Sequence, residues 1–172
     1  MIRTILTYPD PELKKKSQPV KIITADILEL ARDMAETMYN ASGVGLAAPQ
    51  IGVHQRVIVI DVAGRDELPD LITAINPVII HAEGKSYEDE GCLSIPKYSA
   101  NVNRHSTVVV KGIDLTGTEK TWHAEGLLAI AFQHEIDHLD GILFVDHLSP
   151  LKRDLFQRKA RRMAESNTPE EA

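Results

Sequence analysis

The segment at residues 133–141, QHEIDHLDG, constrains this chain more than any other part of its sequence. His134 and His138 stand four positions apart, and on a helix that spacing places both imidazole rings on one face, within reach of a single metal ion. Glu135 follows the first histidine, so its carboxylate projects beside that ion, where it can handle the proton of a bound water. The surrounding pattern therefore predicts a helix from Ala124 to Leu139 that carries a metal site.

This predicted helix has an apolar inner face. Leu127, Ile130 and Ala131 recur at helical spacing on the same stripe as the two histidines. We therefore expect the histidines to point into the core rather than to solvent. Two alternatives stay open at this level, because the histidines could simply pack in a core and the string could be accidental.

Two ligands are too few for a catalytic zinc-type site, which usually has three protein ligands and an open position for water. A metzincin pattern would place a third histidine where this chain has Phe144, and a thermolysin-like pattern would need a downstream carboxylate, for which only Asp154 and Glu165 are available. An upstream ligand fits better. Cys92 is the natural choice, since its neighbour Gly91 and the surrounding turn-forming residues let a thiolate approach a metal. The alternative is that Cys92, like most lone cysteines, is a small buried hydrophobe.

The rest of the chain alternates between helical and extended patterns. Strands come in a block between helices, which predicts an α+β fold: mostly antiparallel β-sheets packed around the central helix, with an N-terminal and a C-terminal helix. We expect one catalytic domain over 1–165 and a flexible tail over 166–172. The other predicted elements are a helix over 24–40 capped by Thr24, strands over 56–62, 71–80 (broken at Asn76 and Pro77), 107–114 and 120–123, and a helix over 149–165 capped by Ser149.

Composition narrows the class of protein. With 43% hydrophobic and 26% charged residues, the chain has the profile of an ordinary soluble domain, and its net charge of −6 argues against a surface that coats nucleic acid. No apolar run is long enough to span a membrane, and no signal-peptide core is evident. The single cysteine excludes an internal disulfide, so we expect a cytoplasmic protein with no membrane association.

The segment over 43–50, GVGLAAPQ, superficially matches a dinucleotide-binding fingerprint. A helix rather than a strand precedes it and Pro49 interrupts what should be a following helix, so we expect no nucleotide cofactor. Instead, missing side chains would let a substrate backbone pair with Val44 and Gly45, while Gln50 supplies an amide donor to polarise a carbonyl oxygen. The alternative is a tight glycine turn that only leads into the strand at Arg56.

Taken together, three segments resemble the peptide deformylase family. That family has G-Φ-G-Φ-A-A-x-Q, E-G-C-Φ-S and Q-H-E-x-D-H-Φ-x-G in this order, with Φ apolar, and the chain matches them at 43–50, 90–94 and 133–141. The resemblance extends over nearly the whole chain, and the C-terminal helix is similar to that of the bacterial class common in Gram-negative species. It implies a hydrolase that removes the N-formyl group from newly made polypeptides that begin with formylmethionine, releasing formate.

The resemblance also implies a metal centre. Cys92, His134 and His138 would bind one divalent ion per chain, with water as the fourth ligand and as the nucleophile. The usual metal of the family is Fe²⁺, and Zn²⁺, Ni²⁺ or Co²⁺ can substitute for it. Glu135 would then act as general acid and base.

Further roles follow from the resemblance. Gln50 and the backbone N–H of Leu93 would hold the developing oxyanion, and an apolar methionine pocket would be lined by Val44, Leu127, Ile130 and Ala131, with His134 at its base. Glu90 and Asp137 would orient an imidazole or pair with Arg104, the alternative being a structural ion pair. Many relatives have an arginine where this chain has Ser99, and we assign no role to that position.

The predicted last helix is strongly basic. Between 152 and 162 only Asp154 opposes six basic residues: Lys152, Arg153, Arg158, Lys159, Arg161 and Arg162. The family resemblance suggests contact with ribosomal RNA through this helix, and the alternative is a solvated surface helix. Two other functions also stay open at this level: a metallopeptidase that uses the same water and glutamate, and a non-catalytic module stabilised by its metal.

Overall fold

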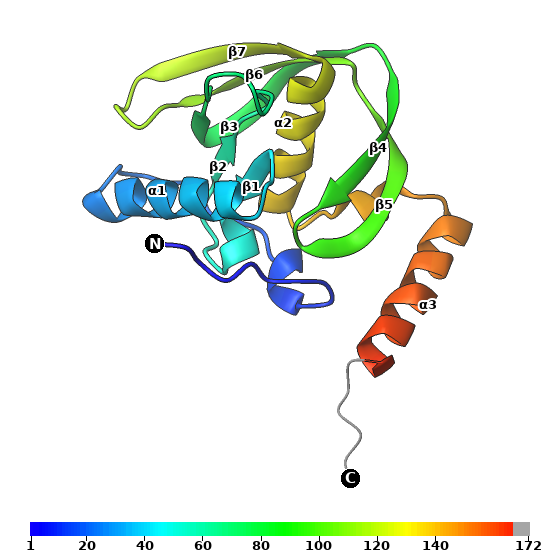
Figure 1. Cartoon of the computed structure of the whole chain (residues 1–172). Coiled ribbons are helices and arrows are strands. Elements are labelled where there is room, and N and C mark those ends of the chain that lie inside the picture. The colour runs from blue at the N-terminus through cyan, green and yellow to red at the C-terminus, as the bar shows by residue number, and fades with distance from the viewer. Residues whose placement is uncertain (167–172) are drawn as a thin grey trace.

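Helix α2 (Gly126–Leu139) lies at the centre of the computed structural model, which describes residues 1–166 (Figure 1). A five-stranded sheet packs on one side of α2, and a two-stranded hairpin stands on the other. The helix predicted from Ala124 begins two residues later, because Ala124 and Glu125 still pair with the neighbouring strand. Most of α2 is buried, and the apolar stripe expected from the sequence is confirmed in part: Ala131, His134 and His138 are buried, whereas Ile130 is half-buried and Leu127 is exposed.

The large sheet has the strand order β1-β2-β3-β6-β7, with every neighbouring pair antiparallel. Four of its strands were predicted, and the α+β class is confirmed. β1 is a short edge strand that the sequence analysis treated only as a segment of close approach. The bounds are β1 Gly45–Ala47, β2 Val57–Ile60, β3 Ile72–Glu83, β6 Thr107–Ile113 and β7 Glu119–Glu125.

The break predicted in β3 at Asn76 and Pro77 is wrong. β3 continues through both residues, with a shift in its register against β6 between Ile75 and Val78. Asn76 adopts a positive φ of 52°, which asparagine tolerates better than most residues. Its side-chain amide also exchanges hydrogen bonds with the backbone of Val20 at 2.8 Å. The irregularity is therefore accommodated as a bulge inside the strand.

The hairpin of β4 (Ser86–Cys92) and β5 (Ile95–Arg104) was not predicted. Its two strands pair with each other and belong to neither edge of the large sheet. The sequence of β4, SYEDEGC, contains no valine or isoleucine and so carries little of the usual strand signal. A two-residue turn, Leu93 and Ser94, joins the strands directly after Cys92.

Two further helices and three short 3₁₀ helices complete the described part of the chain. Helix α3 begins with Ser149 in the predicted capping role, since Ser149 Oγ accepts a hydrogen bond from Lys152 N at 3.3 Å. Thr24 occupies the N-cap position of α1, but its side chain makes no capping bond. Of the predicted tail, Ser166 ends α3 and 167–172 lie outside the described residues. The bounds are α1 Ala25–Asn40, α3 Pro150–Ser166, η1 Pro11–Lys14, η2 Ala48–Ile51 and η3 Phe144–His147.

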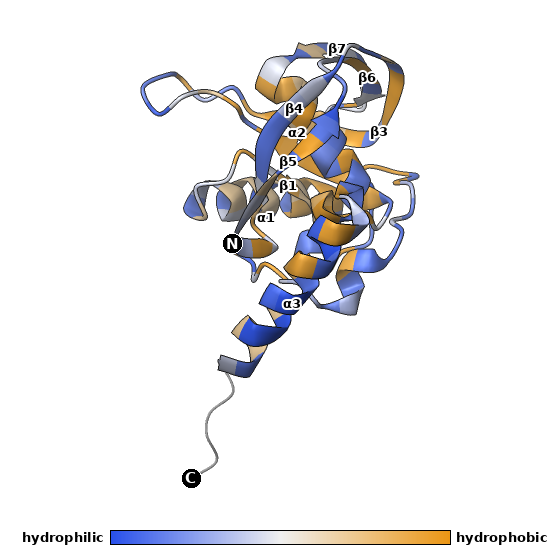
Figure 2. Cartoon of the chain, turned by 90° about the vertical axis from the view of Figure 1, so that its right-hand side faces the viewer, coloured by the Kyte–Doolittle hydropathy of each residue, from blue (hydrophilic) through white to orange (hydrophobic). Residues whose placement is uncertain are grey.

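The core is layered around the large sheet. In β2, Val57 and Val59 pack toward α1, whereas Ile58 and Ile60 pack toward α2, as alternation along a strand requires. A third apolar cluster, including Phe156, joins the hairpin to the C-terminal segment. Figure 2 shows α3 as largely hydrophilic, extending away from these layers. Among the described residues, none of the helices combines the length and apolar character needed to cross a membrane.

Candidate metal centre and active site

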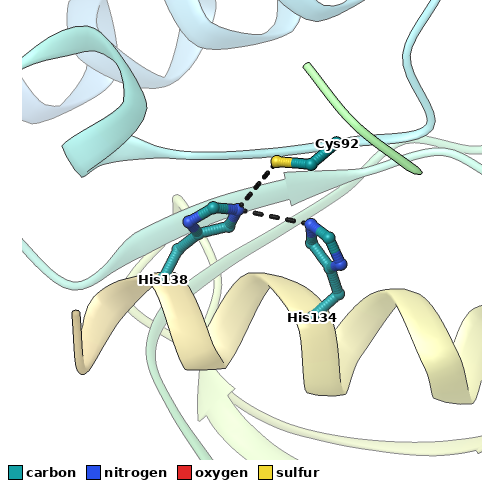
Figure 3. Close-up of side chains that lie close together, drawn as sticks. All are labelled: Cys92, His134 and His138. Carbon is teal, nitrogen blue, oxygen red and sulfur yellow. Dashed lines mark hydrogen bonds between the residues drawn. The ribbon is translucent and has the colours of Figure 1, made fainter. Parts of the chain in front are cut away.

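Three potential metal ligands converge between the hairpin and α2. Cys92 comes from the end of β4, while His134 and His138 come from successive turns of α2, and all three side chains point toward one another (Figure 3). Cys92 Sγ lies 3.3 Å from His138 Nε2, which in turn lies 3.3 Å from His134 Nε2. The three donor atoms lie within 4.8 Å of one another, and within residues 1–166 no other group of His, Cys, Asp and Glu does so.

These separations fit a tetrahedral metal site. Bonds of about 2.0–2.1 Å to nitrogen and about 2.3 Å to sulfur place two nitrogens about 3.3 Å apart and a nitrogen about 3.5 Å from the sulfur. Cys92 and His134 also line a cavity of about 1010 Å³, so one side of the triangle faces open space. Three protein ligands with an accessible fourth position are typical of a catalytic site rather than of a structural one.

Hydrogen bonding orients the His134 ring for metal binding. Its Nδ1 lies 2.9 Å from Glu90 Oε1, and because a carboxylate only accepts, Nδ1 carries the hydrogen and leaves the Nε2 lone pair for the metal. The ring of Phe144 stacks on His134 at a centroid distance of 6.1 Å. His138 is held differently, since its buried Nδ1 has no hydrogen-bond partner among the described residues and its polar contacts, to Cys92 and His134, are made through Nε2.

A buried charge cluster supports Glu90. Arg104 donates from Nε and Nη2 to the two oxygens of Glu90, each at 2.9 Å, and from Nη1 to Asp137 Oδ2 at 2.6 Å. The sequence analysis expected Glu90 either to orient an imidazole or to pair with Arg104. In the structure Glu90 does both, since it contacts His134 and Arg104. Burial alone would raise the pKa of Glu90 and of Asp137. Hydrogen bonds from His134 to Glu90 and from His147 to Asp137, together with those from Arg104, hold both pKa values below their usual range.

The two histidines have opposite pKa shifts in the metal-free chain. Burial alone would lower the pKa of His134, but the Cys92 sulfur and the Glu90 carboxylate raise it well above its usual value. Burial, followed by repulsion from His134, lowers the pKa of His138. Since metal ligands must be deprotonated, the proton favoured on His134 is one that a cation displaces when it binds.

Glu135 is placed as a base with little competition for its oxygens. The residue is 4% exposed, and its Oε2 has no hydrogen-bond partner in the described part of the chain. Burial raises the pKa of Glu135 to about 7. The backbone of Gly45 leaves room for this carboxylate, because a Cβ atom at that position would lie 2.6 Å from Glu135 Oε1.

The amide of Gln50 faces the same centre. Gln50 Oε1 accepts a hydrogen bond from Ala47 N at 2.9 Å, so the amino group points the other way, donating to Ser94 Oγ at 3.0 Å and toward Cys92 Sγ at 3.5 Å. Leu93, in the turn after Cys92, lines the cavity beside it. The sequence analysis missed Ser94, whose buried hydroxyl fixes the Gln50 amide, although it stands within the EGCLS motif.

The five residues predicted to bind substrate lie around the cavity. Val44 and Leu127 stand at the rim with exposed fractions of 44% and 53%, whereas Ala131 is buried. Ser99 also lines the cavity, as do Glu135 and Gln50. The structure thus brings the predicted ligands, the glutamate, the amide donor and the predicted apolar pocket together in one place. The full set of predicted substrate-binding residues on the cavity wall is Val44, Gly45, Leu127, Ile130 and Ala131.

The N-terminal arm, Thr4 to Pro11, is part of the family resemblance, but its role was not predicted: it ties the two sides of the cavity together. Leu6 N donates to Gln50 O at 2.7 Å, and Tyr8 N donates to Ser94 O at 2.8 Å. Because Gln50 follows β1 and Ser94 follows β4, one extended segment fixes the spacing between the sheet and the hairpin. No local residue pattern indicates such bonds, which involve only backbone atoms.

Comparison with known proteins gives one consistent family. Residues 2–154 match the family model described as polypeptide deformylase. A peptide deformylase of Thermodesulfovibrio yellowstonii is 51% identical over 158 residues, which cover 92% of this chain and 96% of the relative. A peptide deformylase of Mesorhizobium japonicum is 48% identical over 169 residues, covering 98% and 96%.

Solved structures agree with the sequence matches. A crystal structure of a peptide deformylase from Legionella pneumophila has a TM-score of 0.88 at 44% identity and covers 98% of this chain and 100% of its own. A peptide deformylase from Ehrlichia chaffeensis, crystallised in complex with actinonin, has a TM-score of 0.89 at 37% identity and covers 97% and 99%. Both the sequence and the fold of this chain therefore match the same set of enzymes over nearly their whole length.

Proposed function

The chain belongs to the peptide deformylase family and removes the N-formyl group from newly made polypeptides, and we propose that it does so at the centre formed by Cys92, His134 and His138. The observation that carries this assignment is the convergence of these three donors with a buried, unpaired glutamate on the wall of one open cavity. A divalent cation held by the three donors supplies Lewis acidity, which lowers the pKa of water and polarises a carbonyl oxygen.

Glu135 provides the proton transfers. Its free Oε2 accepts a proton from the water that attacks the formyl carbon, and the same carboxyl then delivers a proton to the amine nitrogen as the C–N bond breaks. Formate and a free α-amine are the products. A carboxylate without competing donors suits this double role, because it is not held in one protonation state by a fixed partner.

Gln50 and Leu93 provide the electrostatic support. The Gln50 amino group is fixed toward the centre by Ala47 and Ser94, so a hydrogen-bond donor is in place before negative charge develops on the formyl oxygen. The Leu93 backbone N–H would be the second donor, from the turn that follows Cys92. Donors that need no reorientation stabilise the transition state more than the ground state.

The substrate chain fits between two strand edges. Within residues 1–166, β1 is an edge strand of the large sheet and β4 pairs only with β5, so each has a free backbone edge there. Gly45 on β1 and Gly91 on β4 both line the cavity, and a peptide can add to such edges as an extended strand. Leu127, Ile130 and Ala131 then offer an apolar pocket for an unbranched methionine side chain.

We further propose Fe²⁺ as the native metal and the cytoplasm as the site of action. Thiolate and imidazole ligands suit Fe²⁺, Zn²⁺, Ni²⁺ and Co²⁺ alike, so the ligand set does not select among these metals. The choice of Fe²⁺ rests on the family resemblance. Anaerobic purification followed by elemental analysis should find about one iron per chain. Zinc or nickel as the main metal under those conditions would overturn this choice.

For α3 we propose a contact with the ribosome. Lys152 and Lys159 pack over the rings of Tyr87 and Tyr98 on the hairpin, and Arg158 pairs with Asp154 on the same exposed helix, so these three cations already have partners within the chain. Arg161 and Arg162, on the exposed end of the helix, are then the cations that would reach ribosomal RNA.

A cosedimentation experiment tests this contact. The Arg161→Glu/Arg162→Glu protein should lose salt-sensitive binding to purified ribosomes, whereas a control variant at an exposed lysine outside α3, Lys21→Glu, should keep it. Unchanged binding of the double variant would reject the contact.

The activity itself is tested by comparing two substrates. The metal-loaded protein should release formate from a formyl-Met-Ala-Ser peptide and leave the internal bonds of an unformylated peptide intact. A metallopeptidase would show the reverse pattern. A structural metal site would give neither product.

A further inference from the structure

Asp137 has an unusual position on α2, between the two metal ligands in sequence and joined to the charge cluster behind them. Arg104 is the one cation shared by the carboxylates of Glu90 and Asp137, and it donates to both. Arg104 is 4% exposed and Asp137 is 20% exposed at their side chains. One guanidinium therefore balances two largely buried negative charges. Arg104 donates two hydrogen bonds to Glu90 but one to Asp137, so the Asp137 carboxylate needs a further hydrogen-bond donor.

His147 supplies that donor from a different element. Its Nε2 lies 2.8 Å from Asp137 Oδ2, and because a carboxylate only accepts, Nε2 carries a hydrogen. Arg104 Nη1 lies 3.4 Å from the same Nε2, the spacing expected of two donors that share one acceptor oxygen. His147 thus completes a continuous path of hydrogen bonds through Asp137, Arg104 and Glu90 to the ring of His134.

The 3₁₀ helix η3, which carries His147, is itself firmly placed. Asp146 accepts a hydrogen bond from Leu143 N at 2.8 Å and pairs with Lys14 at 2.8 Å. At the start of η3, Phe144 is buried and stacks on His134. The same short helix therefore contacts the His134 ring directly and reaches it a second time through the charge cluster.

We propose that His147 is a positioning residue that slows loss of the catalytic metal. By holding Asp137, it keeps Arg104 clamped on Glu90, and Glu90 keeps the His134 lone pair directed at the cation. This inference rests on the proposed metal centre. Removing a residue that hydrogen-bonds a metal-binding histidine commonly changes metal affinity by about 10–100-fold, and the effect of His147, which acts through four successive contacts, should be smaller.

The test measures metal release rather than turnover. Wild type, His147→Phe, His147→Gln and the control His81→Phe are loaded with Co²⁺ and mixed with excess EDTA, and loss of the thiolate–cobalt absorbance is followed. His147→Phe should release Co²⁺ about 5- to 10-fold faster than wild type. His147→Gln, which restores an N–H donor, should stay within about twofold. His81 is an exposed histidine paired with Glu83 on the large sheet, so its variant should match wild type.

A double-mutant cycle separates positioning from general damage to the fold. If His147 acts through Asp137, then His147→Phe should change the release rate by less than about twofold in an Asp137→Ala background. An equal effect in both backgrounds, or wild-type release from His147→Phe, overturns the inference while leaving the metal centre intact. Failure of the wild-type protein to bind Co²⁺ through sulfur and nitrogen would instead overturn both.

Discussion

Helix α2 and the β4–β5 hairpin face each other across the proposed metal centre, but they are held in place by different forces. α2 is fixed by apolar packing, with Phe132 and Ile136 against the strands of the large sheet. The hairpin has only two strands, and its side toward α2 is joined through the charge cluster of Glu90, Arg104 and Asp137. The two candidate nitrogen ligands are thus preorganised by the main core, whereas the candidate sulfur ligand is held by a smaller apolar cluster, by polar contacts and by the metal when bound.

This difference explains how the proposed centre can be both rigid and accessible. A close-packed helix holds His134 and His138 within narrow limits, because interiors pack at nearly crystalline density. The hairpin leaves a free strand edge and an open cavity beside Cys92, which the substrate needs. Since a metal that bridges the two regions binds only the folded arrangement, it should stabilise the hairpin more than α2.

Removing the sulfur should have the largest effect. Cys92→Ala leaves only the two ligands on α2, so we expect no stoichiometric metal after gel filtration and formate release at background level. Elemental analysis and the formyl-Met peptide assay check both results. Full metal content in this variant would mean that the hairpin does not contribute a ligand.

Removing the proton-transfer group should spare the metal. Glu135→Gln keeps the size of the side chain but cannot accept a proton, so kcat should fall by about 10²–10⁴-fold. Metal content should equal that of wild type, in contrast to Cys92→Ala. A kcat within threefold of wild type would remove Glu135 from the mechanism.

Breaking the charge cluster should destabilise the hairpin. Arg104→Met leaves two largely buried carboxylates without their cation, which should cost about 3–5 kcal/mol in urea unfolding of the metal-free protein. The matched control Arg158→Met removes an exposed partner of Asp154 and should cost below about 1 kcal/mol. Equal losses for the two variants would show that the cluster does not hold the hairpin.

Crowding the glutamate should have the smallest effect. A methyl group at Gly45 would meet Glu135 Oε1 at 2.6 Å, so Gly45→Ala should displace the carboxylate and lower kcat about tenfold with metal content unchanged. Gly64→Ala is the control, because its nearest neighbour to an added Cβ is at 3.6 Å. If both variants keep wild-type kcat, the fit between Gly45 and Glu135 has no catalytic importance.

The sequence predicted α2 and most strands of the large sheet because their apolar periodicity is local and strong. It did not predict the hairpin, since the acidic residues of β4 carry no strand pattern and pairing with β5 is decided by tertiary contacts. The break expected at Asn76 was wrong for a related reason. Its bulge is stabilised by Val20, 56 residues away, which no local pattern reveals.

The site residues divide in the same way, into those that a local sequence pattern predicts and those that only tertiary contacts bring together. The HExxH spacing predicted His134 and His138 as ligands without further help, whereas the prediction of Cys92 required elimination of downstream candidates and a family resemblance. The pairing of Asp137 with Arg104 was a hypothesis that the 2.6 Å contact confirms. No sequence pattern indicated a role for His147, because its partner Asp137 lies close to it only when η3 packs against α2.

The most direct measurement is X-ray absorption at the zinc edge of the zinc-loaded protein. One sulfur at about 2.3 Å and two imidazole nitrogens at about 2.0–2.1 Å, with one further light ligand, is the result expected if the hairpin and α2 share the metal. A first shell of nitrogen and oxygen alone, with no sulfur, would contradict the proposed site and the catalysis derived from it.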